Sequence, residues 1–315
     1  MLPALAAAGL ALCASAVGCG GAAPAASGQA ARFDSARAWK LLEEQVALGP
    51  RPAGTEGAER TRALIERELT ACGLAPVRER FTAQTPAGPL EMANVWAEIA
   101  AADPQKVQAP VIVLASHYDT KRMDVRFVGA NDGGSSTAVL LELARVLASG
   151  PARPVTYRVV FFDGEEAVRS FWQDPDNRYG SRHHVAELER TGGLQRVRYM
   201  ILLDMVGDRD LRLTRDTYSG RELIEAFFSA ARANGLGRHL GGERESMPVK
   251  DDHQSFLTAG VESVDLIDFD YGPDNSWWHS AEDTLDKCSR ESLDAIGRIV
   301  LLGLPQVERM ALRRP

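Results

Sequence analysis

Several features that this chain lacks limit what it can be. The 315 residues contain four cysteines and no Cys-x-x-Cys pair, so a zinc site built from thiolates is not expected. The net charge is −7 and there is no long basic stretch, which argues against nucleic acid and anionic membrane surfaces as partners. Two of the cysteines, Cys72 and Cys288, permit one disulfide, although the sequence does not show that they meet.

A long apolar run lies at the N-terminus. Leu2 to Val17 has the length of a signal-peptide core and is too short to span a bilayer comfortably. The small residues before Cys19 resemble a bacterial lipoprotein cleavage site, and a plainly cleaved secretory signal is the alternative. We therefore expect a signal peptide over residues 1–19, a flexible tether over 20–31 and a single folded domain over 32–315. The protein would be exported to the periplasm, anchored in the envelope only through a lipid at Cys19, or secreted.

Strand and helix patterns alternate along the chain after the tether. Apolar runs, most of them continuous as in sheets covered on both faces, predict strands at 93–99, 111–116, 156–162, 199–203 and 263–267. Helices are predicted at 56–71, 136–148, 185–190, 220–234 and 290–312, after a first helix that Asp34 caps and Gly49-Pro50 ends. Ser219 and Glu222 form a capping-box pattern, and Pro305 should kink or shorten the last helix. This alternation predicts one α/β domain with a largely parallel sheet.

Five short stretches each place a possible metal ligand just after a strand-like apolar run. They are SHYDTK, GANDGGSS, FFDGEEA, LLDMVGD and SWWHSAEDT, which supply His117, Asp132, Glu166, Asp204 and His279. Loops at the carboxyl ends of parallel strands converge on one crevice, so we expect these side chains to meet. Asp132, Glu166 and His279 match the three protein ligands of a catalytic zinc site. His117 and Asp204 would complete a second metal position, as two-metal hydrolases require.

Taken alone, each of these residues has a plainer explanation. A lone Asp after a strand is usually a turn former, and a lone His is more often a surface or core residue than a ligand. Those explanations do not predict that five possible ligands each occur just after a strand-like run. Asp119, two residues beyond His117, is placed to accept a hydrogen bond from the imidazole. In Glu165-Glu166 one carboxylate can bind metal while the other stays free as a general base, the alternative being a solvated acidic loop.

The FFDGEEA stretch carries a resemblance to a known family. Followed by Trp172 and by YGSRH (Tyr179 to His183), it resembles the glutaminyl-peptide cyclotransferases, a branch of the zinc aminopeptidase (M28-type) superfamily. The other matching stretches are LGPRPAGTEGAER, SHYDTK, GANDGGSS, LLDMVG, Asp251-Asp252-His253 and Trp278-His279. The resemblance runs in consistent order over roughly residues 33–304.

The resemblance implies a fold and a set of roles. The fold would be a single-domain three-layer α/β/α sandwich around a mixed, largely parallel sheet. The site residues would be Asp132, Glu166 and His279 for one zinc ion, with a second ion as the alternative, and Glu165 with its hydrogen-bonding partner Asp251 for proton transfer. Trp172 and Trp278 would wall the substrate pocket, and core packing is the alternative for each.

The implied activity is the conversion of an N-terminal glutamine to pyroglutamate with release of ammonia. The α-amine lies within reach of the γ-carboxamide, so closure of the five-membered ring gains from proximity. Glu165 would remove a proton from the amine and return it to the departing nitrogen, while zinc polarises the carbonyl. The alternative is an M28-type aminopeptidase with a dinuclear site, in which Glu165 deprotonates a bridging water. A third possibility is a peptide-binding lipoprotein without activity, which would be expected to have lost the base or a metal ligand. Neither has been lost from this sequence. We expect a monomer that acts on peptide or protein N-termini.

Two positions depart from the family pattern. Asp265 stands where the animal cyclases carry a pocket histidine, and Lys250 stands where the family has a polar neutral residue. The last loop, residues 268–277, is also somewhat longer. These departures bear on substrate recognition more than on metal binding.

Overall fold

The computed structural model describes Met1 and residues 32–103, 109–169, 171–242 and 246–313. The predicted signal peptide, the tether and the lipidation site at Cys19 lie outside the described residues, and they stay predictions. Among the residues that are described, no helix has both the length and the apolar character needed to cross a bilayer.

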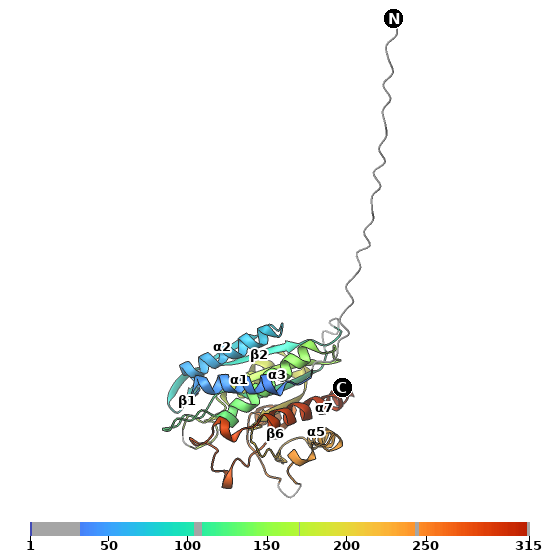
Figure 1. Ribbon diagram of the computed structural model, residues 1–315. Helices are drawn as coiled ribbons and strands as arrows, with labels where there is room; N and C mark the ends of the chain where they lie inside the picture. The colour runs from blue at the N-terminus through green and yellow to red at the C-terminus, as the bar shows by residue number, and fades with distance from the viewer. Residues whose placement is uncertain (2–31, 104–108, 170, 243–245, 314–315) are drawn as a thin grey trace.

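A sheet runs through the molecule (Figure 1), and its six strands follow the order β1-β2-β4-β3-β5-β6. Its strands are β1 (Val77–Thr85), β2 (Gly88–Ile99), β3 (Val111–His117), β4 (Thr156–Phe162), β5 (Val197–Asp204) and β6 (Glu262–Ile267). Strands β3 to β6 are parallel to one another, whereas β1 pairs with β2 and β2 pairs with β4 in antiparallel fashion. The sheet is therefore mixed and largely parallel, which confirms the prediction.

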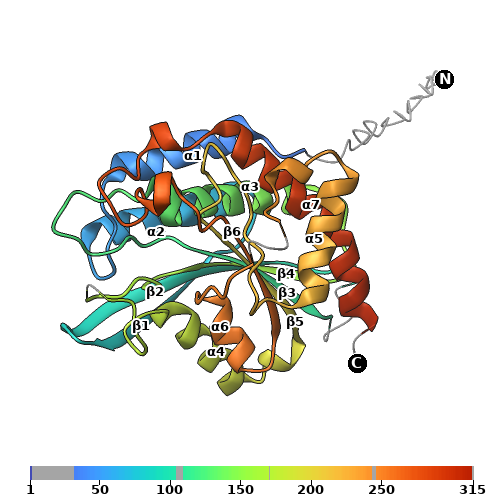
Figure 2. The ribbon, with the colours of Figure 1, turned by 90° about the horizontal axis from the view of Figure 1, so that it is seen from below.

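Helices cover both faces of this sheet (Figure 2). They are α1 (Ser35–Leu48), α2 (Glu56–Ala71), α3 (Ser136–Ser149), α4 (Tyr179–Thr191), α5 (Arg221–Ala233), α6 (His253–Thr258) and α7 (Arg290–Arg313). Helices α4 and α6 pack on one face, and the others pack on the opposite face. Because successive side chains of a strand point to opposite faces, Ile112 and Leu114 of β3 join one core while Val111 and Val113 join the other. The expected three-layer α/β/α sandwich is confirmed.

The N-terminal helix begins and ends as its sequence predicts. The Asp34 carboxylate accepts hydrogen bonds from the backbone N–H groups of Ala36 (2.9 Å) and Arg37 (3.1 Å), and so caps α1. Gly49, with φ +83°, ends it. The two cysteines of the described chain are free thiols, so Cys72 and Cys288 are not bonded to each other.

Other local predictions were wrong, for physical reasons that the packing reveals. Ser219 does not cap α5, because its hydroxyl donates to Asp216 (2.6 Å) and Gly220 takes the N-cap position. Of the two effects expected of Pro305, shortening does not occur, because α7 runs on to Arg313 with its buried side packed in the core; the kink stays a prediction. Helix α4 begins at Tyr179, before its predicted start. Strand β1 and the short helix α6 were not predicted at all.

Candidate active site

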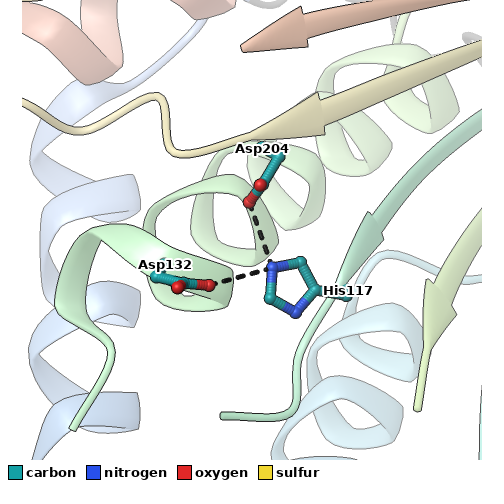
Figure 3. Close-up of side chains that lie close together, drawn as sticks. All are labelled: His117, Asp132 and Asp204. Carbon is teal, nitrogen blue, oxygen red and sulfur yellow. Dashed lines mark hydrogen bonds and ion pairs between the residues drawn. The ribbon is translucent and has the colours of Figure 1, made fainter. Parts of the chain in front are cut away.

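The five predicted ligands come together at the carboxyl ends of the parallel strands. His117 and Asp204 are the last residues of β3 and β5, and Glu166 follows β4. Asp132 lies in an irregular helical turn, η1 (Ala130–Ser135), that leads into α3, and His279 lies in the segment after β6. Figure 3 shows His117, Asp132 and Asp204 facing one another from three different elements. The topological expectation therefore holds for these residues.

Asp132 is shared by two groups of possible ligands. The His117 imidazole Nε2 lies 3.2 Å from Asp132 Oδ1 and 3.0 Å from Asp204 Oδ1. The His279 Nε2 lies 3.3 Å from Asp132 Oδ2 and 2.8 Å from Glu166 Oε1. In each group one nitrogen and two carboxylate oxygens lie within 4.8 Å of one another. The two oxygens of Asp132 thus point to different neighbours, as they do in a carboxylate that bridges two positions.

The donor set fits a zinc ion. Imidazole nitrogen and carboxylate oxygen are ligands that zinc accepts, and three protein ligands leave one coordination position open. Asp132 is 3% exposed, and among the described residues the ring of His279, 3.3 Å away, is the neighbour of its Oδ2, without a well-aligned hydrogen bond between them. Buried carboxylate oxygens need a cation or a donor, so the Asp132–Glu166–His279 group matches the requirements of a metal. The His117–Asp132–Asp204 group has the same chemistry.

The electrostatics of the two histidines reflect the same excess of negative charge. Burial favours the neutral ring of His279, but the carboxylates of Glu166 and Asp132 outweigh it and raise the pKa to about 9. Burial likewise opposes protonation of His117, whereas Asp204, Asp119 and Asp132 raise the pKa of this ring well above its usual value. The carboxylates of the site therefore stabilise the positively charged form of both His117 and His279.

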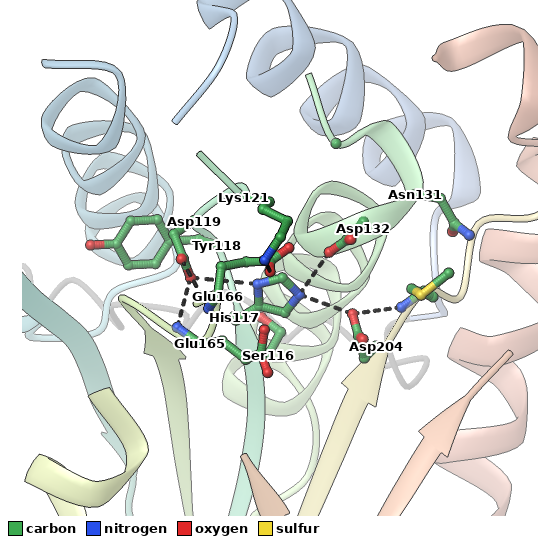
Figure 4. Close-up of polar contacts among 12 residues, drawn as sticks. Ser116, His117, Tyr118, Asp119, Lys121, Asn131, Asp132, Glu165, Glu166 and Asp204 are labelled. Atoms are coloured by element: carbon green, nitrogen blue, oxygen red, sulfur yellow. Dashed lines mark hydrogen bonds and ion pairs between the residues drawn. The ribbon is translucent and has the colours of Figure 1, made fainter. Parts of the chain in front are cut away.

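The turn after Asp132 requires glycine. Gly133 has φ +71°, and a Cβ atom there would lie 2.8 Å from the carbonyl oxygen of Asp119 and 2.9 Å from Cε1 of His117. Asp119 in turn accepts hydrogen bonds from the backbone N–H groups of Glu165 (3.1 Å) and Glu166 (3.3 Å), and its Oδ1 lies 3.5 Å from Nδ1 of His117 (Figure 4). Asp119 therefore joins the β3 loop to the loop after β4.

A pocket of about 300 Å³ opens beside these groups. Its lining combines the acidic residues with apolar walls: Asp132, Glu165, Glu166, Trp172, Asp204, Tyr218, Pro248, Val249, Lys250, Asp251, Ile267, Phe269, Trp278 and His279. The Trp278 ring stacks on the imidazole of His279, with centroids 4.0 Å apart. Both predicted tryptophans therefore line the pocket.

Glu165 and Asp251 lie together in this pocket. The Trp172 indole N–H donates to Glu165 Oε1 (3.2 Å). Burial raises the pKa of Glu165 well above its usual value, and Asp251 and Glu166 add to the shift. Burial also raises the pKa of Asp251, with Asp204 as the next cause. The negative charge of Asp251 therefore disfavours ionisation of Glu165.

Several residues of the site were not singled out from the sequence. Lys121 is buried, with its Nζ 3.4 Å from Glu166 Oε2, although it belongs to the SHYDTK stretch. Tyr218 and Phe269 line the pocket from segments that carry no recognisable pattern. Of the two departures, Lys250 is exposed at the pocket, whereas Asp265 is buried in β6 and does not line it.

The fold and this site define a member of peptidase family M28, whose family model matches residues 94–303. The chain belongs to this family. A Mus musculus glutaminyl-peptide cyclotransferase-like protein is 30% identical over 302 residues, which cover 87% of this chain and 76% of that protein. The structure of Acidobacteriales bacterium glutaminyl cyclase is similar with a TM-score of 0.83 and 37% identity, covering 92% of this chain and 99% of that one. Porphyromonas gingivalis glutaminyl cyclase matches with a TM-score of 0.77 and 27% identity over 87% and 99% of the two chains. Within family M28, the chain therefore lies in the glutaminyl cyclase branch, as its motifs predicted.

Proposed function

We propose that this protein is a zinc-dependent glutaminyl-peptide cyclotransferase, which converts the N-terminal glutamine of a peptide to pyroglutamate and releases ammonia. The observation that carries the proposal is the pocket in which Glu165 and two tryptophans lie beside the Asp132–Glu166–His279 group. Similarity to named glutaminyl cyclases over most of the chain supports the same function.

Asp132, Glu166 and His279 would hold the zinc ion. When bound, zinc supplies Lewis-acid polarisation of the substrate carbonyl and stabilises the negative charge that develops on its oxygen. His117 and Asp204 face Asp132 from the other side and would orient it or hold a second ion. Asp119 would fix the imidazole of His117 through Nδ1, because the partner of one ring nitrogen sets the tautomer of the other.

Glu165 would carry the proton during ring closure. The raised pKa of its carboxyl group suits a base that takes a proton from the α-amine and then returns it to the departing ammonia. The Trp172 indole holds one carboxylate oxygen, and this contact orients the other toward the pocket. Asp251 would tune Glu165 as the second member of an acid pair.

The pocket walls would favour cyclisation over hydrolysis. Trp172, Trp278 and Phe269 surround a small space in which a glutamine side chain must fold back toward its own amine. Apolar walls exclude water, and the amine of the same residue then has the advantage of proximity.

An M28 aminopeptidase activity is the second candidate. The observation that favours it is the pair of complete ligand groups that share Asp132, because a bridging carboxylate between two metal positions is what a dinuclear hydrolase needs. In that case Glu165 would activate a water instead of an amine.

One assay separates these activities. The purified protein is incubated with a Gln-initiated peptide, and the products are followed by mass spectrometry. Loss of ammonia at constant chain length supports the cyclase, loss of the first residue supports the peptidase, and an unchanged peptide contradicts both. Peptides that begin with Glu or with N-acetylated Gln, and incubation without protein, are the controls. Removal of metal with a chelator should abolish turnover, and added zinc should restore it.

A further inference from the structure

The turn that carries Asp132 has a backbone conformation that needs support from outside. Gly129 has φ +51°, and a Cβ atom there would lie 2.5 Å from the carbonyl oxygen of Asp132. Because Asp132 belongs to both groups of possible ligands, a small shift of this turn would disturb both. The groups that hold its backbone therefore matter for the whole site.

Arg51 holds the carbonyl side of the turn. Its side chain is 0% exposed, and its guanidinium donates to the carbonyl oxygens of Val128 (2.5 Å) and Gly129 (2.9 Å). A third donor, the Nε–H, reaches the carbonyl oxygen of Tyr118 (3.0 Å), which lies between His117 and Asp119. One buried cation thus ties together the two loops that provide Asp132 and His117.

Asp283 holds the N–H side of the same turn. Its carboxylate accepts hydrogen bonds from the backbone N–H groups of Asn131 (2.7 Å) and Asp132 (3.1 Å), and from the Tyr271 hydroxyl (2.8 Å). It is 0% exposed and lies in the same stretch as His279. A single carboxylate therefore connects the loops of two zinc ligands.

We propose that Arg51 and Asp283 are positioning residues that grip the turn of Asp132 from both sides and so set the affinity of the site for zinc. The proposal rests on the zinc site of the proposed function, but not on the reaction. Complementary polar groups meet the backbone here: the guanidinium donates to carbonyl oxygens, and the carboxyl group of Asp283 accepts from N–H groups. Burial lowers the pKa of Arg51 to about 10, with Asp283, Asp132 and Asp119 opposing the shift, so the guanidinium keeps its charge at neutral pH.

The test measures zinc binding directly. The variants are Arg51→Met, which removes the charge and all donors, Arg51→Lys, which keeps the charge without the planar fork, and Asp283→Asn. Metal-free protein is titrated with Zn²⁺ in competition with a chromophoric chelator, and with Co²⁺ to record the visible spectrum of the bound ion. Loss of residues that orient metal ligands weakens metal binding by about 10–100-fold, and we expect that range for Arg51→Met and Asp283→Asn. Arg51→Lys should lie between them and the parent protein.

A matched control separates positioning from general loss of stability. Glu308 is a buried carboxylate that accepts from the Tyr157 hydroxyl (2.5 Å) and from Arg153 (2.9 Å), and Tyr157 lies near the start of β4, away from the site. Glu308→Gln should lower the melting temperature of the metal-free protein and leave zinc affinity and the Co²⁺ spectrum unchanged.

The outcomes are distinct. If the parent protein binds zinc and Arg51→Met and Asp283→Asn bind it equally well, the proposal is wrong, whatever happens to turnover. If the parent protein binds zinc but does not cyclise glutamine, the proposed function is wrong. The zinc affinities of the parent protein and of the variants still decide whether Arg51 and Asp283 position the site. A parent protein that binds no zinc overturns both. Should Arg51→Met not fold without metal, Arg51→Lys and Asp283→Asn decide, because the first keeps the buried charge and the second keeps the size of the side chain.

Discussion

Replacement of Glu165 by glutamine tests the centre of the proposed mechanism. The change is nearly isosteric and leaves an oxygen to accept the Trp172 indole N–H at its present distance of 3.2 Å. What it removes is the ability to take a proton from the substrate amine. Glu166 next to it is untouched, so the proposed metal ligands Asp132, Glu166 and His279 stay in place.

The magnitude follows from the role assigned to this side chain. A positioned general base contributes on the order of 10²–10⁴ to the rate, so kcat should fall by that factor. The corresponding rise in the activation barrier is about 3–5 kcal/mol. KM should change little, because the amide keeps the shape of the pocket, and zinc content should match that of the parent protein.

Stability should move in the opposite direction from activity. Burial and the neighbouring Asp251 raise the pKa of Glu165 in the folded chain, so between its ordinary value of 4.5 and the raised value the folded state binds more protons than the unfolded state. Linkage then requires the stability of the metal-free protein to fall as the pH rises through that window. Glutamine does not ionise, so the variant should lose less stability over the same pH range and should melt at an equal or higher temperature at neutral pH.

The assay combines three measurements on one preparation: ammonia release from a Gln-initiated peptide, zinc per chain, and melting curves of the metal-free protein between pH 5 and 9. Asp251→Asn serves as a companion variant, because it changes the neighbour of the base and not the base. A Glu165→Gln protein with turnover close to that of the parent would refute the assignment of the base. A variant that loses zinc would show that the residue acts on the metal.

Three further predictions test other parts of the molecule. Gly133→Ala should destabilise the protein by roughly 1–3 kcal/mol in chemical denaturation and weaken zinc binding, because the residue has φ +71° and its Cβ would press on His117. Burial alone would raise the pKa of Glu79, but the hydrogen bond (2.9 Å) and the charge interaction with His184 outweigh burial and lower this pKa. The pair therefore stabilises the fold above about pH 4.5, and this stability is lost as the pH falls through the lowered pKa of Glu79. Glu79→Gln should accordingly flatten the acid side of the stability curve, and an unchanged curve would contradict this. Lys250 is exposed at the pocket, so Lys250→Gln should lower kcat/KM about twofold to fivefold for peptides with an acidic second residue. Neutral peptides should show no change, and high salt should remove the difference between the two kinds of peptide.

The fold and the ligand groups could be predicted because both depend on simple regularities. Continuous apolar runs indicated the parallel strands. Because the carboxyl ends of parallel strands lie at one edge of a sheet, the sequence alone predicted that His117 and Asp204 lie close together. Strand β1 escaped prediction because its residues are mostly polar and only one of them, Ala83, is buried. Helix α6 has six residues, too few for a period to be recognised.

The contacts that support the ligands could not be predicted, since they join residues far apart in the chain. Arg51 reaches carbonyl groups 67 to 78 positions away, and Asp283 reaches N–H groups about 150 positions away. Arg51 lies within the stretch LGPRPAGTEGAER, which resembles the family, and Asp283 lies in the stretch that supplies His279, yet neither stretch tells what its arginine or aspartate binds. The pairing of Trp172 with Glu165 likewise depends on how the loop after β4 folds back.

The two departures from the family pattern, Asp265 and Lys250, should differ in their effect on substrate recognition. An aspartate in place of a histidine at position 265 looks like the larger change, because it exchanges a base for an acid. Yet burial, with Asp251 and Asp204 nearby, raises the pKa of Asp265 well above its usual value, which favours the neutral carboxyl group. It also lies outside the pocket lining, and one of its carboxylate oxygens lies 3.8 Å from Nδ1 of His253. Lys250, by contrast, adds an exposed positive charge at the pocket itself, and substrate choice should therefore follow Lys250 and not Asp265.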